Sequence, residues 1–213
     1  MFIRECMNTN LVTIPSTTSL ADARRIMDAH CIRRLPVVDK GKPVGMVSRD
    51  TLDRAGPSQL TTFSIHELSY LLSKITVKDV MKRDLVVVSP DATIEESVAL
   101  AQFRHVGALL IVEEGRAVGI VTTNDIFYKL VNPMLGIDQP GIRLSIHKWE
   151  GIPMLQKILG IFDRFNAEVV TFYVMVHCDS KEHDFISHLK VSDPAGLMDE
   201  LRKNGFEVHE RAR

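Results

Sequence analysis

The pattern of hydrophobic positions predicts strands and helices in the order β-α-β-β-α, twice within the first 131 residues of this 213-residue chain. Strands are marked by short apolar runs, and helices by apolar residues that recur every three or four positions. Two of the strands in each copy are separated only by a short polar turn containing glycine, which predicts a hairpin. The expected strands lie at 11–14, 35–38 and 44–47 in the first copy and at 85–88, 109–112 and 118–121 in the second. A short helix closes each copy.

The two copies are related by sequence as well as by pattern. The segment 37–48 matches 111–122 closely, and Gly45 and Gly119 lie 74 positions apart. The same offset holds without a gap from Met7 through Leu52. A single register over such a length indicates an internal duplication.

Start signals mark the helices of both copies. Ser19-x-x-Asp22 precedes the first helix, and Thr93-x-x-Glu96 precedes its equivalent as a capping box. Between the copies, a turn at 55–58 leads to a further helix that begins at Ser64. Its apolar face is expected to contain Leu68, Leu71, Leu72 and Ile75.

The pattern changes after residue 132 to β-α-β-β-α-β, the ferredoxin-like order. Strands are expected at 142–147, 168–177, 185–191 and 206–211. The first helix has an apolar face of Leu155, Ile158, Leu159 and Phe162. The second is bracketed by Asp193 as N-cap, Pro194 at its first position and Gly205 after its end.

Composition excludes several classes of function. The 26 basic and 27 acidic residues give a net charge of −1, which provides no electrostatic footprint for nucleic acid or an anionic membrane. The longest apolar run, 106–112, is far shorter than a membrane span, and the first residues lack the apolar core of a signal peptide. Three widely spaced cysteines form no disulfide framework. We therefore expect a soluble, cytoplasmic protein.

Each repeat resembles a CBS motif, and the lead-in Val77–Met81 is typical of one. The resemblance implies an α/β (α+β) fold in which two βαββα repeats pack about a pseudo-two-fold axis as a CBS pair, or Bateman module. Residues 1–131 would form the pair, with repeat one at about 1–54, a connecting helix at 55–74 and repeat two at about 75–131. After a linker at 132–140, residues 141–213 resemble an ACT domain. With the segment 57–75, this layout is similar to the acetoin-utilization regulatory protein family.

The nucleotide signature of CBS repeats is Gly-x-x-Thr/Ser-x-x-Asp at a strand-to-helix turn. Glycine allows close backbone approach, the hydroxyl and the amides of a helix N-terminus suit phosphate, and the carboxylate suits ribose hydroxyls. The second repeat has the full set of Gly119, Thr122 and Asp125, whereas the first has Gly45, Ser48 and Thr51. Asp50 falls one residue early, about 100° around the helix, and should point away from that cleft. The structural alternative for such a motif is a helix cap.

Basic residues differ between the repeats too. Arg33 and Arg34 precede the second strand of the first repeat, where the second repeat has Gly107 and Ala108. In CBS pairs, basic residues at this position reach the phosphates of a ligand whose ribose is held by the other repeat. The resemblance therefore implies that Arg33 or Arg34 serves the site of Asp125. The alternative is that both arginines lie on a loop and are simply solvated. The resemblance also places base-pocket segments at Thr13, Ile14 and Pro15 and at Val88, Ser89 and Pro90, and it leaves open which segment serves which site.

Catalysis finds little support in the sequence. It contains no nucleophile elbow, Walker loop or His-Glu-x-x-His helix, so we expect neither catalytic residues nor a catalytic cofactor. His177, Asp179, His183 and His188 match no familiar metal spacing, and no metal site is expected. Cys31 and Cys178, flanked by apolar residues, are expected to face the core.

The resemblance implies a non-catalytic regulatory protein for energy sensing. It would bind an adenine nucleotide of the AMP, ADP or ATP type, form a homodimer or larger closed oligomer, and signal to an unidentified protein partner through the dimer and tail. A ligand-free interaction scaffold is one alternative. An amino-acid sensor acting through the tail is another, although the tail has Pro153 where amino-acid-binding ACT domains place a glycine amide. No nucleic acid or membrane partner is expected.

Overall fold

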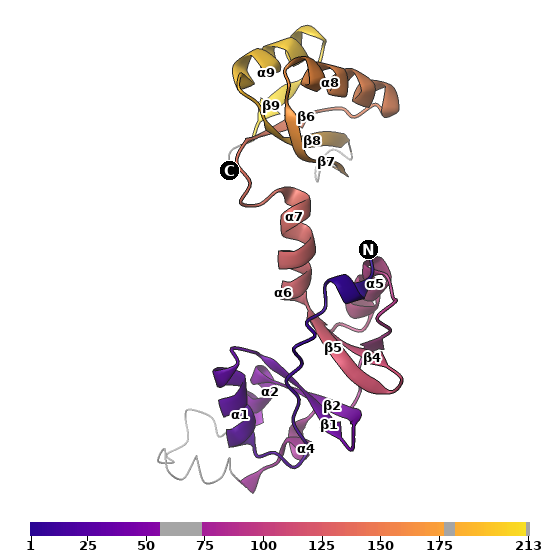
Figure 1. The fold of residues 1–213 in the computed structure, drawn as a ribbon, viewed down its shortest axis with the longest axis vertical. Coiled ribbons are helices and arrows are strands. Elements are labelled where there is room, and N and C mark those ends of the chain that lie inside the picture. The colour runs from indigo at the N-terminus through magenta and orange to yellow at the C-terminus, as the bar shows by residue number, and fades with distance from the viewer. Residues whose placement is uncertain (56–73, 177–181, 212–213) are drawn as a thin grey trace. The chain divides into compact units, whose positions relative to one another are not determined.

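The computed structural model describes residues 1–55, 74–176 and 182–211 (Figure 1). The predicted connecting helix and the polar turn that follows residue 176 lie almost wholly outside the described residues. The chain divides into two compact units, Met1–Phe127 and Tyr128–Arg213. Across the described ranges, no helix is long and apolar enough to cross a membrane.

The first repeat folds as its pattern predicts over most of its length. Helix α1 (Leu20–Ala29) begins at Ser19, whose side chain accepts a hydrogen bond from the Asp22 amide. Strands β1 (Arg34–Asp39) and β2 (Lys42–Ser48) form an antiparallel hairpin, and α2 (Arg49–Ala55) follows. The buried core of this repeat consists of Ile14, Leu20, Ala23, Met27, Leu35, Val37, Val47, Leu52 and Val77.

The second repeat preserves the register of the first. Its elements are α4 (Val77–Val80), β3 (Val87–Val88), α5 (Ile94–Phe103), β4 (Ala108–Glu113), β5 (Arg116–Thr122) and α6 (Thr123–Ile126). Leu35 lies opposite Val47 in one hairpin, and Leu109 lies opposite Val121 in the other. Each hairpin also has one register shift at the equivalent position. The duplication is therefore present in the structure as well as in the sequence.

The first strand of each repeat is shorter than predicted. In the first repeat it is reduced to one bridge, in which the Ile14 amide donates to the Pro36 carbonyl and the Val38 amide donates to the Ile14 carbonyl. Proline has no N–H to extend this ladder. The second repeat has Leu110 at the position of Pro36, and its amide donates to the Val86 carbonyl beside the short strand β3. One proline accounts for the difference.

The lead-in of each repeat packs on the other repeat. The Ile3 amide, in the 3-10 turn Ile3–Glu5, donates to the Ala92 carbonyl at 2.8 Å. The Val77 amide donates at the same distance to the carbonyl of Thr18, the position equivalent to Ala92. Ile3 and Val77 are both fully buried. Because each repeat completes the core of its neighbour, the two repeats form one folding unit.

The second unit contains a four-stranded antiparallel sheet. Its elements follow the expected order as β6 (Ile142–Ile146), α8 (Ile152–Arg164), β7 (Glu168–Val176), β8 (His183–Lys190), α9 (Pro194–Lys203) and β9 (Val208–Glu210). The strand order is β7-β8-β6-β9. The buried core between helices and sheet consists of Leu144, Ile146, Met154, Ile158, Ile161, Phe162, Phe185, Leu189, Leu197, Leu201 and Val208.

The start of the expected linker is packed against this sheet. A π-helical turn (Phe127–Val131) leads into α7 (Asn132–Leu135), which ends at Gly136 with a left-handed φ of 61°. The Thr171 hydroxyl donates to the Met134 carbonyl at 2.6 Å, and the Arg143 guanidinium donates to the Leu135 carbonyl at 3.0 Å. These bonds fix the end of α7 within the second unit.

Two side-chain expectations were wrong. Leu159 was assigned to the core face of α8, but it is exposed, and Met154 and Ile161 are buried instead. The buried stripe therefore lies to one side of the predicted face. Cys31 is exposed rather than core-facing, because it lies in the turn after α1 with a positive φ of 52°.

The capping box of α5 supports a test of helix stability. The Thr93 amide donates to Glu96 Oε2 at 3.1 Å, and the Glu96 amide donates to the Thr93 hydroxyl oxygen at 3.2 Å. The bond from the Thr93 amide, followed by that from its side chain, lowers the pKa of Glu96 from its ordinary value. A lowered pKa contributes stability above the unfolded pKa, and this contribution is lost as pH falls through the folded pKa.

We expect Thr93→Ala to lower the free energy of unfolding by about 1 kcal/mol, the usual cost of losing an N-cap. The pKa of Glu96 should rise toward its ordinary value. Urea denaturation and an NMR titration measure the two effects. Thr17→Ala, at an exposed threonine outside the helices, is the control. Equal effects of the two substitutions would contradict the capping role.

Candidate functional site

Thr122 and Asp125 form the N-terminal cap of α6. The Thr122 amide and hydroxyl both donate to Asp125 Oδ2, at 2.8 and 2.6 Å, and the Asp125 amide donates back to the Thr122 hydroxyl oxygen at 3.3 Å. This reciprocal arrangement is a capping box. The motif therefore forms the helix cap that was the structural alternative to a ligand site. The cap fixes the Asp125 carboxylate beside the first turn of α6.

The glycine of each motif accommodates the crossing lead-in. A Cβ at Gly119 would lie 2.8 Å from the Met7 sulfur, and one at Gly45 would lie 2.6 Å from the Met81 sulfur. The carbonyl oxygens of Asn8 and Lys82 lie close to the same two points. From the sequence, both glycines were expected to allow the close approach of a ligand. In the structure, the group that approaches each of them is the lead-in of the other repeat.

The first repeat has the same cap without the carboxylate. The Thr51 amide donates to the Ser48 hydroxyl oxygen at 3.2 Å, and the two hydroxyls lie 2.9 Å apart. Asp50 was expected to point away from the cleft, but it lines a cavity together with Ser48 and forms an exposed ion pair with Arg33 at 3.8 Å. The equivalent of Asp125 is therefore a neutral hydroxyl, and the nearby carboxylate offsets an arginine.

A small polar cavity of about 210 Å³ lies where the two repeats meet. It is lined by Arg33, Arg34, Ser48 and Asp50 of the first repeat and by Thr123 and Asn124 of the second. We call this the basic cavity, because its two guanidinium groups outnumber its one carboxylate. The structure thus brings Arg33 and Arg34 to residues adjacent in sequence to Thr122 and Asp125.

Gly107 allows Arg34 to reach this position. A Cβ at residue 107 would lie 2.8 Å from the Arg34 guanidinium. The backbone makes the same hydrogen bond at the equivalent positions of the two repeats. The Arg49 amide donates to the Arg33 carbonyl in the first repeat, and the Thr123 amide donates to the Gly107 carbonyl in the second. Because Gly107 of the second repeat has no side chain, the guanidinium of Arg34 from the first repeat fits beside it. From the sequence, Gly107 was expected only to lack the positive charge that Arg33 has at the equivalent position.

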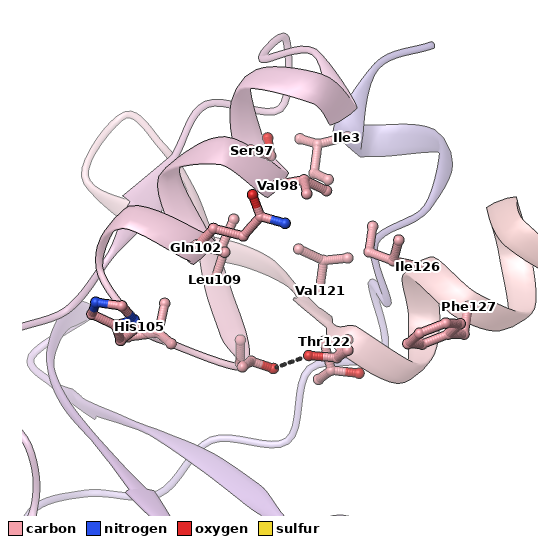
Figure 2. Close-up of a pocket in the computed structure, with 15 residues that line it drawn as sticks. Ile3, Ser97, Val98, Gln102, His105, Leu109, Val121, Thr122, Ile126 and Phe127 are labelled. Atoms are coloured by element: carbon pink, nitrogen blue, oxygen red, sulfur yellow. Dashed lines mark hydrogen bonds between the residues drawn. The ribbon is translucent and has the colours of Figure 1, made fainter. Parts of the chain in front are cut away.

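A larger apolar cavity of about 760 Å³ lies between α5 and the start of α6, over β4 and β5 (Figure 2). Figure 2 shows Ser97, Val98 and Gln102 of α5 facing Val121 and Ile126 across this space. Its lining consists of Ile3, Ser97, Val98, Ala101, Gln102, His105, Val106, Gly107, Ala108, Leu109, Val121, Thr122, Thr123, Ile126 and Phe127. Thr123 lines both cavities. All three residues of the motif were expected at the ligand site, but only Thr122 lines this cavity, and Gly119 and Asp125 line neither of the two described cavities.

The corresponding space in the first repeat is occupied by its own side chains. Met27 and the buried Leu52 stand where the second repeat has Ala101 and the less buried Ile126. Two ion pairs also link α1 to α2, Arg24–Asp53 at 3.1 Å and Arg49–Asp28. The equivalents of these four charged residues are Val98, Phe127, Thr123 and Gln102. The substitutions make the large apolar cavity a feature of the second repeat.

The CBS domain profile matches residues 3–57 and 77–132, more than half of the chain. The chain belongs to the CBS domain family. The match covers both predicted repeats and ends before the tail, whose resemblance to an ACT domain stays a prediction.

Relatives of this CBS protein differ in size and function. It is 29% identical over 133 residues to an inosine-5'-monophosphate dehydrogenase of Korarchaeum cryptofilum, a match that covers 62% of this chain but 25% of the enzyme. The chain therefore spans about a quarter of that relative. A putative acetoin utilization protein (AcuB) from Vibrio cholerae is 29% identical, with a TM-score of 0.53 and coverage of 66% of this chain and 98% of that one.

A third comparison concerns a CBS domain pair solved with 5'-methylthioadenosine and S-adenosylmethionine. It has a TM-score of 0.51 and 22% identity, and it covers 62% of this chain and 97% of the other. At this identity the likeness shows the fold alone.

The two base-pocket segments of the CBS pair lie away from both described cavities. Thr13, Pro15 and Ser89 are exposed, whereas Ile14 and Pro90 are buried. The amide and carbonyl of Ile14 are engaged by β1, and the Pro90 carbonyl accepts a bond from the Arg4 amide. None of these residues, nor Val88, lines the basic or the apolar cavity. Their contact with a base stays a prediction.

Proposed function

We propose that this chain is a non-catalytic regulatory protein whose CBS pair senses an adenine nucleotide. One observation carries the proposal: a basic cavity and an apolar cavity adjoin at Thr123, next to the capped motif of Thr122 and Asp125. A nucleotide has the matching division into an anionic phosphate chain and a planar base. Neither cavity alone would favour that class of ligand.

The phosphates belong in the basic cavity. Arg33 and Arg34 supply guanidinium groups, whose planar fork of donors matches phosphate oxygens. The hydroxyls of Thr123 and Ser48 add neutral donors to the same space. Asp50 would repel a phosphate, but it lies in an ion pair with Arg33 that a ligand can replace. The remaining positive charge favours a di- or triphosphate over an uncharged nucleoside.

We propose that the base lies in the apolar cavity and not against residues 13–15 or 88–90, the segments expected from the sequence. A volume of about 760 Å³ lies in the usual range for small-molecule sites, which are mostly apolar with a few polar groups that orient the ligand. Gln102 and His105 provide such groups among the lining residues. The ribose would then pass Thr122 and Asp125, where a carboxylate can accept bonds from its hydroxyls.

Regulation follows from the position of the motif at the start of α6. A ligand shifts a conformational equilibrium only by its differential affinity for the two states. A nucleotide that bonds to Thr122 or Asp125 competes with the cap that holds this helix end. Its binding therefore changes the stability of α6, and we propose that a homodimer and the tail pass this change to a protein partner.

A ligand panel tests the proposed function. AMP, ADP, ATP, adenosine, S-adenosylmethionine, 5'-methylthioadenosine and the amino acids are each added to the full chain in a thermal-shift assay. A ligand that binds the folded state raises the midpoint by mass action. We expect the adenine nucleotides to do so. A response to amino acids alone would favour a sensor in the tail, and no response at all would favour a scaffold.

Asp125→Ala should weaken nucleotide binding by about 10- to 150-fold, since losing a charged hydrogen-bond partner costs about 1.5–3 kcal/mol. Thr51→Ala changes the equivalent position of the first repeat, whose side chain lines neither described cavity, and it should weaken binding much less than Asp125→Ala does. Isothermal titration calorimetry measures both affinities and should give one dominant site per chain. Asp125→Asn keeps an acceptor for the cap and separates the loss of charge from the loss of helix stability.

Two equal sites, or an Asp125→Ala variant that binds as the wild type does, would mean that the motif of the second repeat is not the ligand site.

A further inference from the structure

Asp50 places a negative charge in the cavity assigned to the phosphates. Its side chain lines the basic cavity, whose other charged residues are Arg33 and Arg34. The lining of this cavity therefore carries two positive charges and one negative charge. A carboxylate and a phosphate oxygen repel each other at short distance, because both are anionic. A bare phosphate chain bound to the two arginines is thus repelled by the third charged group of its own site.

The ion pair with Arg33 holds this carboxylate only weakly. Arg33 Nη2 lies 3.8 Å from Asp50 Oδ1, which is beyond hydrogen-bond distance, and the two side chains are 76% and 67% exposed. Exposed ion pairs of this kind contribute little stability. A phosphate that binds Arg33 separates the pair at small cost. It then leaves the Asp50 carboxylate beside the phosphate without a cation.

Oxygen atoms that suit a small divalent cation line the same space. The lining adds the side-chain amide of Asn124 and the hydroxyls of Ser48 and Thr123. Mg²⁺ takes oxygen ligands, and it usually combines one or two carboxylates with phosphate oxygens and water. No histidine or cysteine is among the described residues that line this cavity, and these are the ligands that zinc and softer metals prefer. The donor set therefore favours Mg²⁺.

We propose that the basic cavity binds the magnesium complex of ATP or ADP, with Asp50 as the carboxylate that the protein supplies to the metal. This inference rests on the proposed function, which assigns the phosphates to the same cavity. The Mg²⁺ ion lies between Asp50 and oxygens of the terminal phosphates, while Arg33 and Arg34 bind other phosphate oxygens. Its two positive charges offset the carboxylate and part of the phosphate charge, so that the repulsion becomes an attraction.

The metal enters together with the nucleotide. Across the ranges 1–55, 74–176 and 182–211, no group of three or more His, Cys, Asp or Glu side chains could hold a metal ion. The chain by itself is therefore expected to bind Mg²⁺ only weakly. Adjacent phosphates of ATP and ADP bind Mg²⁺ between them, whereas AMP has a single phosphate. Asp50 consequently selects the magnesium complexes of the di- and triphosphate.

Calorimetric titrations of the full chain in excess Mg²⁺ and in EDTA test this selection. We expect the wild type to bind ATP at least about tenfold more tightly with Mg²⁺ than without it. AMP should bind equally in the two buffers, within about twofold. The comparison uses one protein and changes only the metal.

Asp50→Asn separates a metal ligand from a residue that only positions Arg33. It keeps the size of the side chain and an acceptor for Arg33, but it removes the charge. Free ATP should bind more tightly than to the wild type and the magnesium complex less tightly, so the preference for Mg²⁺ falls to about twofold or less. A positioning role would weaken both forms of ATP alike. Unchanged AMP affinity shows that the variant has folded.

The matched control is Asp84→Asn. Asp84 is also an exposed aspartate paired with an arginine, Arg104, at 2.6 Å, and it lines neither described cavity. This variant should keep the tenfold preference of the wild type for ATP with Mg²⁺.

Mn²⁺ locates the ion directly, because it accepts the same oxygen ligands and broadens the NMR signals of nearby residues. With ATP present, Mn²⁺ should broaden the backbone amide signals of Asp50 and Asn124. Mn²⁺ alone should not broaden these two signals selectively. Excess Mg²⁺ should restore them.

Equal affinity for ATP with and without Mg²⁺, or a preference that survives Asp50→Asn, would overturn the inference. Selective broadening by Mn²⁺ without nucleotide would do the same. If AMP binds and ATP does not, this inference fails while the proposed function stands. Absence of binding by every adenine nucleotide would instead overturn the proposed function, and this inference with it.

Discussion

Arg33→Ala combined with Arg34→Ala is expected to lower the affinity for ATP by about 100-fold or more, while adenosine binds within about threefold of wild type. Both guanidinium groups line the basic cavity, and each charge-assisted bond to phosphate is worth about 1.5–3 kcal/mol. Adenosine has no phosphate and loses none of these bonds. Calorimetric titration with the two ligands measures the difference.

The charge-matched control is Arg25→Ala combined with Arg54→Ala, which removes two exposed arginines that line neither described cavity. It should leave ATP affinity within about threefold, because exposed charges at a distance are screened by salt. The loss in the Arg33 and Arg34 variant should be greatest at low ionic strength for the same reason. An equal loss of adenosine affinity would show that the substitutions disturb the cavity rather than a phosphate contact.

Gly141→Ala is expected to destabilise the second unit by about 3 kcal/mol or more, the largest stability effect of any substitution proposed for this chain. Gly141 has a φ of 131°, a conformation that L side chains rarely adopt, and a Cβ there would overlap the Leu189 carbonyl, with its carbon 2.9 Å away. Backbone in a paired strand cannot move aside without breaking the sheet. Strain and clash therefore act together.

Gly205→Ala separates the two effects. Gly205 also has a positive φ, 86°, but no atom lies within 4 Å of a Cβ at that position, so only the conformational cost of about 1–2 kcal/mol remains. Trp149 is the single tryptophan of the chain and stacks on Phe185 in the core of this unit. Its fluorescence during urea denaturation reports the unfolding of the second unit. Equal midpoints for the two variants would contradict a clash at Gly141.

Features that depend on short stretches of chain could be predicted from the sequence. The helix starts at Ser19, Thr93 and Asp193 were placed correctly, because a cap is a bond between residues three positions apart. The hairpins were predictable for a similar reason, as the two strands of each are joined by a short turn. The duplication then transferred each assignment from one repeat to the other.

The Gly-x-x-Thr-x-x-Asp motif was also visible in sequence, but only its local contacts could be predicted from it. The cap between Thr122 and Asp125 is a local contact and was weighed in advance. The partner of Gly119 was not, because Met7 lies more than a hundred residues earlier in the chain. Spacing shows that a glycine is needed and does not show which group approaches it.

Features that arise from contacts between distant segments became visible only in the folded structure. The exchange of lead-ins brings Ile3 to Ala92 and Val77 to Thr18, and no periodicity within a repeat records which core it completes. The basic cavity forms because Arg34 lies over Gly107 of the other repeat. Among the described residues, the place of β7 at an edge of its sheet follows from the strand order β7-β8-β6-β9. Hydrophobic pattern identifies which faces are buried, whereas long-range packing selects the neighbours against which they are buried.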